Sequence, residues 1–284
     1  MEDMVLVGVD GSSESLDAAR WALTEASLRR WSVWFARVSP PAQVVDPQVD
    51  VAYRHSAMQA ADPVFGELEA AAKDLRVPVH FSLLFGQAGD VLVRLSARAG
   101  LNVVGHRHRT GLPSRLDSVA ATLAAHAQCP TAVIPSSDHS QANSTYDRPA
   151  ADQSQFAGQI VAAVEPGPAA ATVLSVAADI AQRHNRPLNA VTVGPATEDQ
   201  SVLRDLLTHL QAKHPGLRCS VHTLSGRPVH EITEAARDSW LLVVGTRGIS
   251  GLPGMLRGSV SQALLQHVTS PVLVVPSPHS GEPE

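Results

Sequence analysis

The sequence predicts an α/β protein made of two tandem copies of one unit, each a parallel β-sheet with helices on both faces. Three observations predict this: the chain repeats itself, strand-like runs alternate with helical patterns in each copy, and the last strands are apolar at consecutive positions. With 284 residues, 44% of them hydrophobic, the chain is large enough for two domains of ordinary size, each with its own core.

The repeat is clearest toward the end of each copy. "VVGHRHRTGLPSRLDSVAATLAAHAQCPTAVIP" at 103–135 aligns with "VVGTRGISGLPGMLRGSVSQALLQHVTSPVLVVP" at 243–276, with one residue missing in the first copy. Both contain a strand ending in glycine, then "GLP", "SV", a helix, and a proline that opens a final β-branched strand. This pattern indicates a duplication.

Upstream, the two copies follow the same order of elements. A buried strand, an acidic residue, a turn and an amphipathic helix are predicted at 4–26 and at 159–181. Short strands follow at 32–38 and 187–193, and then a strand, a glycine turn and a helix at 80–96 and 220–236. Such alternation predicts right-handed βαβ units and a parallel sheet.

Three segments define the predicted domain organisation. Residues 1–137 form the first domain and residues 156–278 the second, and the polar stretch 138–155 between them predicts a flexible linker. The first copy is about fifteen residues longer between its second strand and second helix. There, "PPAQVVDPQVD" at 40–50 predicts an irregular loop.

Composition and charge argue against several classes of function. The net charge is −5 and the basic residues are scattered, so the chain lacks the basic patch of a nucleic-acid-binding protein. No apolar run reaches the length of a membrane span and no signal-like segment opens the chain, so we expect a cytoplasmic protein that does not bind membranes. Cys129 and Cys219 stand in unrelated contexts, which predicts neither a disulfide nor a metal-ligand pair.

The stretch "GTRGISGLPGMLRGSV" at 245–260 places five glycines between a strand and a helix. Unpaired N–H groups and the helix dipole make such a helix N-terminus an anion site, and Ser259 adds a hydroxyl and a cap. The alternative is a glycine-rich connection without a ligand. The stretch lacks the Gly-Lys-Ser/Thr of a P-loop, and "GVDGSS" at 8–13 does not complete a dinucleotide fingerprint.

The spacing Gly-x-x-Gly, nine residues, Gly-Ser in "GTRGISGLPGMLRGS" resembles the nucleotide loop of the universal stress protein family. The opening "VGVDGS", the order of elements and "SPVLVVP" at 270–276 are similar to that family as well. The resemblance implies a Rossmann-like, adenine-nucleotide α-hydrolase-like sheet of five strands in the order 3-2-1-4-5 in each domain. It also implies ATP, with or without Mg²⁺, at the switch point between strands one and four.

The family's nucleotide-binding positions transfer to both copies. In the first copy they are Asp10, Val38, Gly105, Ser118 and Val119. In the second copy they are Glu165, Val193, Gly245, Arg247, Gly248, Gly258, Ser259 and Val260.

The two copies depart from the family pattern at opposite ends of the site. In the first, His108 and Asp117 replace the glycines that stand at 248 and 258 in the second, and a carboxylate at a helix N-terminus repels phosphate. In the second, the loop is complete, but "EPGP" at 165–168 replaces the Asp-Gly-Ser turn and its prolines remove N–H donors. These differences predict that the second domain is the better ATP site and that the first binds ATP weakly or not at all.

No catalytic or metal site is predicted. "HRHR" at 106–109 offers two histidines, too few for a structural zinc site, and no nucleophile–base pair repeats between the copies. We therefore expect ATP to act through conformation or partner binding, with at most slow hydrolysis.

Two other functions stay open: a scaffold without nucleotide, and an enzyme of the α-hydrolase type that acts at the α-phosphate. The resemblance also implies that the fifth strands pair, between the two domains of one chain or in a homodimer, and the protein partner is unknown.

Overall fold

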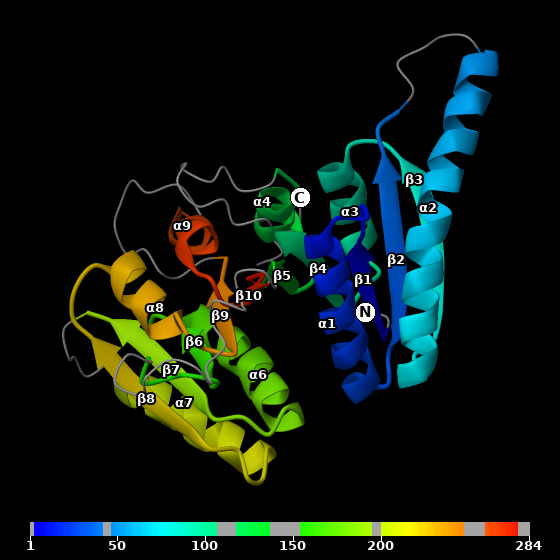
Figure 1. Cartoon of the computed structure of the whole chain (residues 1–284). Helices are drawn as coiled ribbons and strands as arrows, with labels where there is room; N and C mark the ends of the chain where they lie inside the picture. Colours follow the sequence, from blue (N-terminus) through cyan, green and yellow to red (C-terminus); the bar gives the residue numbers. More distant parts are fainter. Residues whose placement is uncertain are drawn as a thin grey trace, which may run out of the picture. The chain divides into compact units, whose positions relative to one another are not determined.

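A computed structural model describes residues 3–41, 47–106, 118–136, 154–194, 200–246 and 259–277. The chain divides into two compact units, Met1–Ser137 and Asp138–Glu284 (Figure 1). Each unit is an α/β fold with one parallel sheet, as the sequence predicts.

In the first unit the strands lie in the order β3-β2-β1-β4-β5, and every described neighbouring pair is parallel. Strands β1 and β4 are the neighbours at which the strand order reverses. The elements are β1 Met4–Gly8, α1 Ser13–Arg29, β2 Ser32–Ser39, α2 Pro47–Leu75, β3 Val79–Phe85, α3 Ala88–Ser96, β4 Leu101–His106, α4 Ser118–His126 and β5 Thr131–Pro135.

The second unit repeats this topology, with its strands in the order β8-β7-β6-β9-β10. The order 3-2-1-4-5 is therefore confirmed in both copies. The elements are β6 Ile160–Ala163, α6 Pro168–Arg183, β7 Leu188–Val193, α7 Gln200–Lys213, β8 Cys219–Leu224, α8 Pro228–Ala236, β9 Leu241–Gly245, α9 Ser259–His267 and β10 Val272–Val275.

Helices cover both faces of each sheet, because the central strands are apolar on consecutive residues. Val5, Val7, Val103 and the whole of β9 are buried, which requires cover on both sides. In the first unit α1 packs against α2, and α3 packs against α4. In the second unit α6 packs against α7, and α8 against α9 (Figure 1).

The ends of α1 follow from local sequence. Ser12 is the N-cap, and its hydroxyl oxygen accepts a hydrogen bond from the amide of Ser15. The helix ends where Arg30 adopts a left-handed conformation with φ 58°, and the Arg30 amide donates to the carbonyls of Ala26 and Ser27. Both ends are thus satisfied by the chain itself, which fixes where α1 begins beside the sheet.

The predicted irregular loop at 40–50 is wrong at its C-terminal end, because α2 already begins at Pro47. Proline suits the first helical turn, and the following residues, rich in alanine, extend the helix to 29 residues against 14 in α7. The extra length of the first copy is therefore largely helical. Tyr53 anchors it by donating from its hydroxyl to the carbonyl of Pro40 and by contacting the Phe85 ring.

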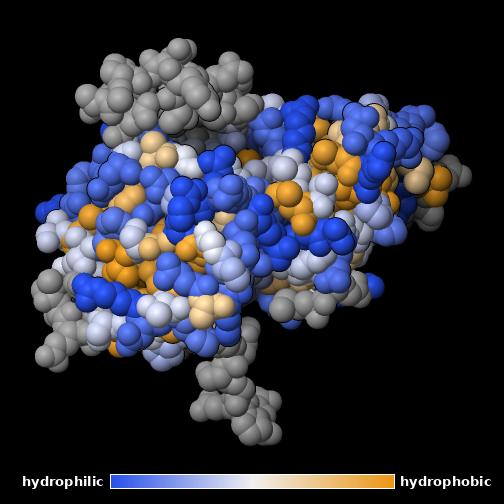
Figure 2. All heavy atoms as spheres, turned by 90° about the horizontal axis from the view of Figure 1, so that it is seen from below, coloured by the Kyte–Doolittle hydropathy of each residue, from blue (hydrophilic) through white to orange (hydrophobic). Residues whose placement is uncertain are grey.

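The surface is mostly hydrophilic on the face that Figure 2 shows, with hydrophobic patches between polar residues. The large hydrophobic side chains that are exposed include Val51 and Met58 on α2 and Val202 on α7. Among the described residues, no helix has both the length and the apolar content to cross a bilayer.

Candidate functional site

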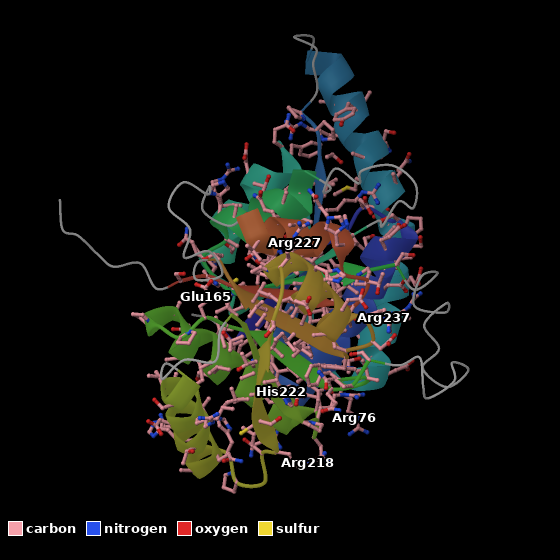
Figure 3. All side chains as sticks on the ribbon, turned by 90° about the vertical axis from the view of Figure 1, so that its left-hand side faces the viewer. Arg76, Glu165, Arg218, His222, Arg227 and Arg237 are labelled. Atoms are coloured by element: carbon pink, nitrogen blue, oxygen red, sulfur yellow. The ribbon has the colours of Figure 1, made fainter. Side chains whose placement is uncertain are left out.

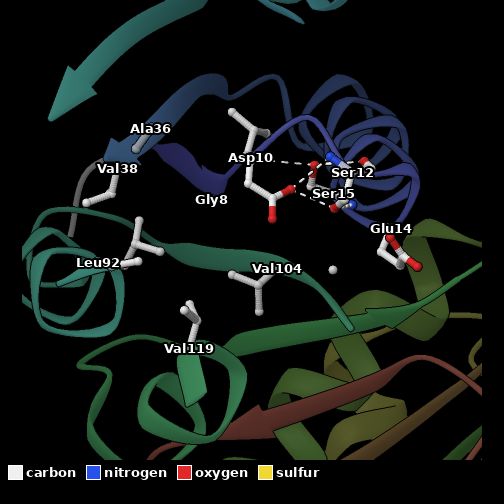
Figure 4. Close-up of a pocket in the computed structure, with 13 residues that line it drawn as sticks. Gly8, Asp10, Ser12, Glu14, Ser15, Ala36, Val38, Leu92, Val104 and Val119 are labelled. Atoms are coloured by element: carbon white, nitrogen blue, oxygen red, sulfur yellow. Dashed lines mark hydrogen bonds between the residues drawn. The ribbon is translucent and has the colours of Figure 1, made fainter. Parts of the chain in front are cut away.

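A cavity of about 270 Å³ opens at the carboxyl ends of β1, β2 and β4 in the first unit (Figure 4). This is the switch point of the sheet, where ligands of open α/β folds bind. Its volume is near the lower end of the range for small-molecule pockets. The described lining residues are Gly8, Val9, Asp10, Ser12, Glu14, Ser15, Ala36, Val38, Ala88, Leu92, Val104, Gly105 and Val119.

Asp10 follows β1 and is held in a tight turn by the start of α1. Its carboxylate accepts hydrogen bonds from the amide of Ser12 at 2.9 Å and from the hydroxyl of Ser12 at 2.6 Å. The hydroxyl oxygen of Ser15 accepts from the amides of Asp10 and Gly11 at 3.4 and 3.2 Å. Gly11 takes φ +90°, a conformation that favours glycine, so this residue permits the turn.

The turn keeps Asp10 ionised. Partial burial opposes ionisation, but the hydrogen bonds from Ser12 and Ser15 outweigh it, so the pKa of Asp10 lies below its usual value of 3.8. Asp10 therefore presents a carboxylate, an acceptor of hydrogen bonds, at the edge of the cavity (Figure 4).

Gly105 is the second-last residue of β4 and lies against the first turn of α1. A Cβ on Gly105 would lie 2.4 Å from the carbonyl carbon and oxygen of Glu14 and 2.8 Å from the amide of Ser15. Those are backbone atoms that cannot move aside singly, so α1 packs this closely only because residue 105 has no side chain. The glycine thus has a packing role in addition to its place in the cavity wall.

The floor of the cavity is apolar. Gly8 and Ala36 are neighbours in β1 and β2, and Leu92 of α3 and Val104 of β4 enclose them. A Cβ on Gly8 would lie 2.9 Å from Leu92 Cδ1 and 3.3 Å from Val104 Cγ1. Leu92 and Val104 therefore pack more closely on the backbone of Gly8 than a side chain at residue 8 would allow.

The residues of this floor were not predicted as site residues, although a signal for them exists in the sequence. Gly8 stands two residues before Asp10 and Ala36 two before Val38, and residues two apart in a strand share a face. Ser12 and Ser15 belong to the start of α1, and Leu92 lies on α3. Sequence spacing alone does not show that these residues lie next to β1. Of the first-copy predictions, Asp10, Val38, Gly105 and Val119 do line the cavity.

In the second unit the corresponding positions lie at the same edge of its sheet. Glu165 follows β6 (Figure 3), Val193 ends β7, Gly245 ends β9, and Val260 is buried in the first turn of α9. The hydroxyl of Ser261 donates to the carbonyl of Gly245 at 2.7 Å and ties α9 to β9. The topology therefore brings these four predicted residues to one edge.

The start of α6 differs from the start of α1. Its N-cap is Gly167, which makes no side-chain cap hydrogen bond, and Pro168 follows in the first turn. Glycine caps a helix less well than serine does, and proline contributes no N–H donor. The polar turn around Asp10 therefore has no direct equivalent in the second unit.

Several predicted residues lie outside the described part of the chain. These are Arg247, Gly248 and Gly258, together with His108 and Asp117 of the first copy. Ser118 and Ser259 are the first residues of α4 and α9, but the description does not extend to their side chains. Most of the predicted linker, 138–153, is also outside it, whereas the amide of Ser154 donates to the Asp238 carboxylate within the second unit.

The described lining of the cavity combines an apolar floor with hydroxyl and carboxylate acceptors. Its two ionisable side chains are Asp10 and Glu14, and the hydroxyl of Ser13 donates to the Glu14 carboxylate. Such a wall suits a flat, largely apolar group that carries hydroxyl or amino donors. Within the described ranges, no three His, Cys, Asp or Glu residues gather in a way that could hold a metal ion.

Comparison with known proteins extends these observations. The sequence model of the universal stress protein family matches residues 1–135 and 157–276. A universal stress protein of Mycobacterium tuberculosis is 26% identical over 315 residues, which cover 96% of this chain and 95% of the relative. Another from Mycolicibacterium smegmatis is 29% identical over 298 residues, covering 95% of this chain and 96% of the relative.

The fold is also found in a solved structure. The crystal structure of a universal stress protein from Archaeoglobus fulgidus matches with a TM-score of 0.76. The match covers 97% of this chain and 99% of that one, at 17% sequence identity. The likeness therefore extends over both units and concerns the fold.

Proposed function

The chain belongs to the universal stress protein family, and on that premise we propose that it binds ATP and acts through nucleotide-dependent conformation or partner binding. The site we propose is the carboxyl edge of the central strands in each domain, where β1 meets β4 and β6 meets β9. Its role is regulation in the stress response.

The observation that carries the proposal is the cavity at the switch point of the first unit, because the second unit repeats this topology with Glu165, Val193 and Gly245 at the corresponding edge. It lies at the switch point, its floor is apolar, and an ionised aspartate stands at its edge. An adenine ring is flat and largely apolar, and ribose offers hydroxyl donors to a carboxylate. The cavity thus matches the nucleoside part of ATP.

We place the better ATP site in the second domain, because its loop carries the full glycine spacing. Gly245 and Gly248 begin the loop, and Gly258 precedes α9, whose N-terminus favours a phosphate. Ser259 and Arg247 add a hydroxyl and a positive charge, and Glu165, Val193 and Val260 surround the nucleoside in this proposal. In the first domain Asp117 stands directly before α4 and opposes phosphate there.

The mode of action we propose is binding rather than fast turnover. In this proposal the glycine-rich loop before α9 donates hydrogen bonds to the phosphates of ATP. Fast hydrolysis would also need a general base positioned to activate water. Mg²⁺ would enter the site as part of the ATP complex, because ATP normally carries this ion. Pairing of β5 and β10, within one chain or in a homodimer, and a cytoplasmic location stay predictions.

The test begins with the full chain purified without added nucleotide. We expect mass spectrometry of the denatured protein to find bound ATP, or calorimetry to show about one ATP bound per chain when it is added. Gly258→Asp should abolish this binding, because it places a carboxylate at the start of α9.

Asp117→Gly is the matched variant, which restores glycine at the corresponding position of the first copy. It should leave the second site intact and add ATP binding to the first. If the full chain neither retains ATP nor binds it at millimolar concentration, the ATP proposal is wrong. A scaffold that acts through protein contacts alone would then be the better account.

A further inference from the structure

Strand β3 forms a free edge of the first sheet. It stands at the end of the strand order and, among the described strands, it pairs with β2 alone. This pairing runs without a bulge from Val79 to Phe85, over the whole strand. The other side of β3 therefore presents a row of unpaired N–H and C=O groups, which is a template for a further strand.

The sequence of β3 lacks the residues that usually protect an edge strand. Such strands are commonly blocked by lysine, by other charges or by proline, whereas β3 reads VHFSLLF. Five of its seven residues are apolar, and none of the seven is buried. Even Phe81 stays partly exposed, although its ring stacks on Phe35 and contacts Phe65 of α2. Apolar surface thus accompanies the unpaired backbone.

The hydrogen bonds to β2 determine which backbone groups of β3 are free. The amide of Val33 donates to the carbonyl of Pro78, just before β3. Just after β3, the amide of Gly86 donates to the carbonyl of Ser39. Successive residues of a strand direct these groups to opposite sides, so the even-numbered residues bond to β2. The outward N–H and C=O groups belong to Val79, Phe81, Leu83 and Phe85.

These outward groups match an antiparallel copy of the same strand. The register that pairs the whole strand places Ser82 opposite Ser82 of the second copy. Val79 then faces Phe85 and Phe81 faces Leu83, so each hydrogen-bonded pair joins two residues whose backbone groups are free. A two-fold axis at Ser82 relates the two copies.

The side chains are complementary in this register. Phe81 and Phe85 contact rings on α2, so the odd-numbered side chains lie on that face and form apolar cross-strand pairs. On the other face His80 lies opposite Leu84, and the two Ser82 side chains lie opposite each other. No like charges meet across the pair.

The same arrangement would cover exposed side chains at both ends of α2. Val51 and Met58, in its N-terminal half, are 67% and 58% exposed, and Leu75 at its C-terminal end is 42% exposed. Because α2 connects two parallel strands and packs on β3, it runs antiparallel to β3 (Figure 1). The two-fold axis therefore brings Val51 and Met58 of one copy to the end of the interface that holds Leu75 of the other.

We propose that β3 is a docking edge for a second copy of this chain, which it joins by antiparallel pairing in a symmetric dimer centred on Ser82. This interface lies apart from the carboxyl edge proposed for ATP and from the fifth strands, so it does not rest on the proposed function. Each copy contributes its β3 once, and the assembly closes at two chains through this edge.

The test is sedimentation velocity of the full chain over a dilution series, in which we expect a dimer that dissociates on dilution. Ser82→Asp should abolish the dimer, because two carboxylates then face each other across the axis. An aspartate at this position can still accept the hydrogen bond that the Trp34 indole donates to the Ser82 hydroxyl at 3.0 Å. Ser220→Asp makes the same change on β8, the edge strand of the second unit, and should leave the dimer intact.

Leu83→Pro is a second variant, because it removes an N–H group that points away from β2 and proline is tolerated at such edge positions. It should also abolish the dimer, while thermal unfolding stays cooperative. A chain that stays monomeric at every soluble concentration overturns the proposal. A dimer that persists in Ser82→Asp or in Leu83→Pro overturns it as well, since another surface then holds the two copies together.

Disulfide trapping tests the register, in a Cys219→Ser background that lacks the half-buried thiol. Ser82→Cys should form a covalent dimer on oxidation, because residues opposite each other in a non-hydrogen-bonded pair have Cα atoms about 4.5 Å apart. His80→Cys lies opposite Leu84 and should remain monomeric in denaturing electrophoresis without reductant. Equal trapping of the two cysteine variants would overturn the proposed pairing.

Discussion

The hydroxyl of Ser12 joins the aspartate of the cavity to the helix beside it: it donates to the Asp10 carboxylate at 2.6 Å and accepts from the Ser15 amide at 3.3 Å. Ser12→Ala removes both hydrogen bonds. We expect it to destabilise the first domain by about 1 kcal/mol, as loss of a serine N-cap does. Differential scanning calorimetry measures the change.

The same substitution should raise the pKa of Asp10 toward 3.8, because hydrogen bonds from Ser12 lower it in the folded protein. A carboxylate whose pKa is lowered on folding stabilises the protein above its unfolded pKa, and this contribution is lost as pH falls through the folded value. The pH dependence of unfolding below about pH 4 should therefore become shallower in Ser12→Ala. Ser13→Ala, one residue further on, is the control and should leave the pKa of Asp10 unchanged.

A second prediction concerns Asn102, which lies in β4 where β9 has Leu242. Asn102 is 1% exposed, and neither its amide nitrogen nor its amide oxygen has a hydrogen-bond partner among the described residues. A buried polar group without a partner costs about 1–3 kcal/mol. Asn102→Leu should stabilise the first domain by an amount of this order, and chemical denaturation should show it.

Leu242→Asn is the reciprocal change and should destabilise the second domain, because it buries an amide in an apolar strand position. A loss of stability in Asn102→Leu would contradict the prediction. It would mean that the amide is satisfied in solution, for example by a buried water.

The duplication and the alternation of elements were sufficient to predict a parallel α/β sheet in each copy, whereas the strand order 3-2-1-4-5 came from the resemblance to the universal stress protein family and is confirmed by the fold. Asp10, Val38 and Val119, which the resemblance implied as site residues, stand at strand ends or helix starts that the topology gathers at one edge, and they line the cavity. The sequence was not sufficient for the floor: Gly8 lines the cavity beneath Leu92, and the closeness of that contact depends on how α3 packs on the sheet.

Gly105 illustrates a second limit of the sequence. A glycine after a strand suggested close approach of a phosphate, and the fold adds the close approach of the α1 backbone at Glu14 as a separate reason for glycine there. The start of α2 is a third case. The stretch 47–52 is a proline followed by polar and apolar residues without glycine, which is compatible with a loop or a helix. Tertiary contacts such as Tyr53 with Phe85 decide between the two.

A third prediction concerns the two thiols. Burial raises the pKa of Cys129 to about 12, and it also raises the pKa of Cys219, which is only half-buried. Since the thiolate is the reactive form, Cys129 should resist alkylation at pH 8 in the folded protein. Labelling with iodoacetamide followed by peptide mass spectrometry should find Cys219 modified first.

In Cys219→Ser, labelling of Cys129 should then report unfolding of the first domain. Its rate should rise with denaturant concentration in parallel with the unfolded fraction. Rapid labelling of Cys129 without denaturant would show that the connection between α4 and β5 opens locally, against the prediction.

The last prediction concerns His222 on β8 (Figure 3), whose ring stands edge-on to Phe156 with centroids 4.8 Å apart. Its Nε2 lies 3.1 Å from the Asn189 side-chain oxygen, which also accepts from the Ser220 hydroxyl at 2.9 Å. Burial disfavours the charged ring, so the pKa of His222 lies below its usual value of 6.5.

Below pH 6.5 the unfolded chain therefore binds protons more readily than the folded chain at this residue. The stability of the second domain should accordingly decrease as pH falls from 6.5 toward the folded pKa, since protons then favour the unfolded state. His222→Gln keeps a donor for Asn189 and removes the titration, so its unfolding free energy should depend less on pH between 5 and 6.5.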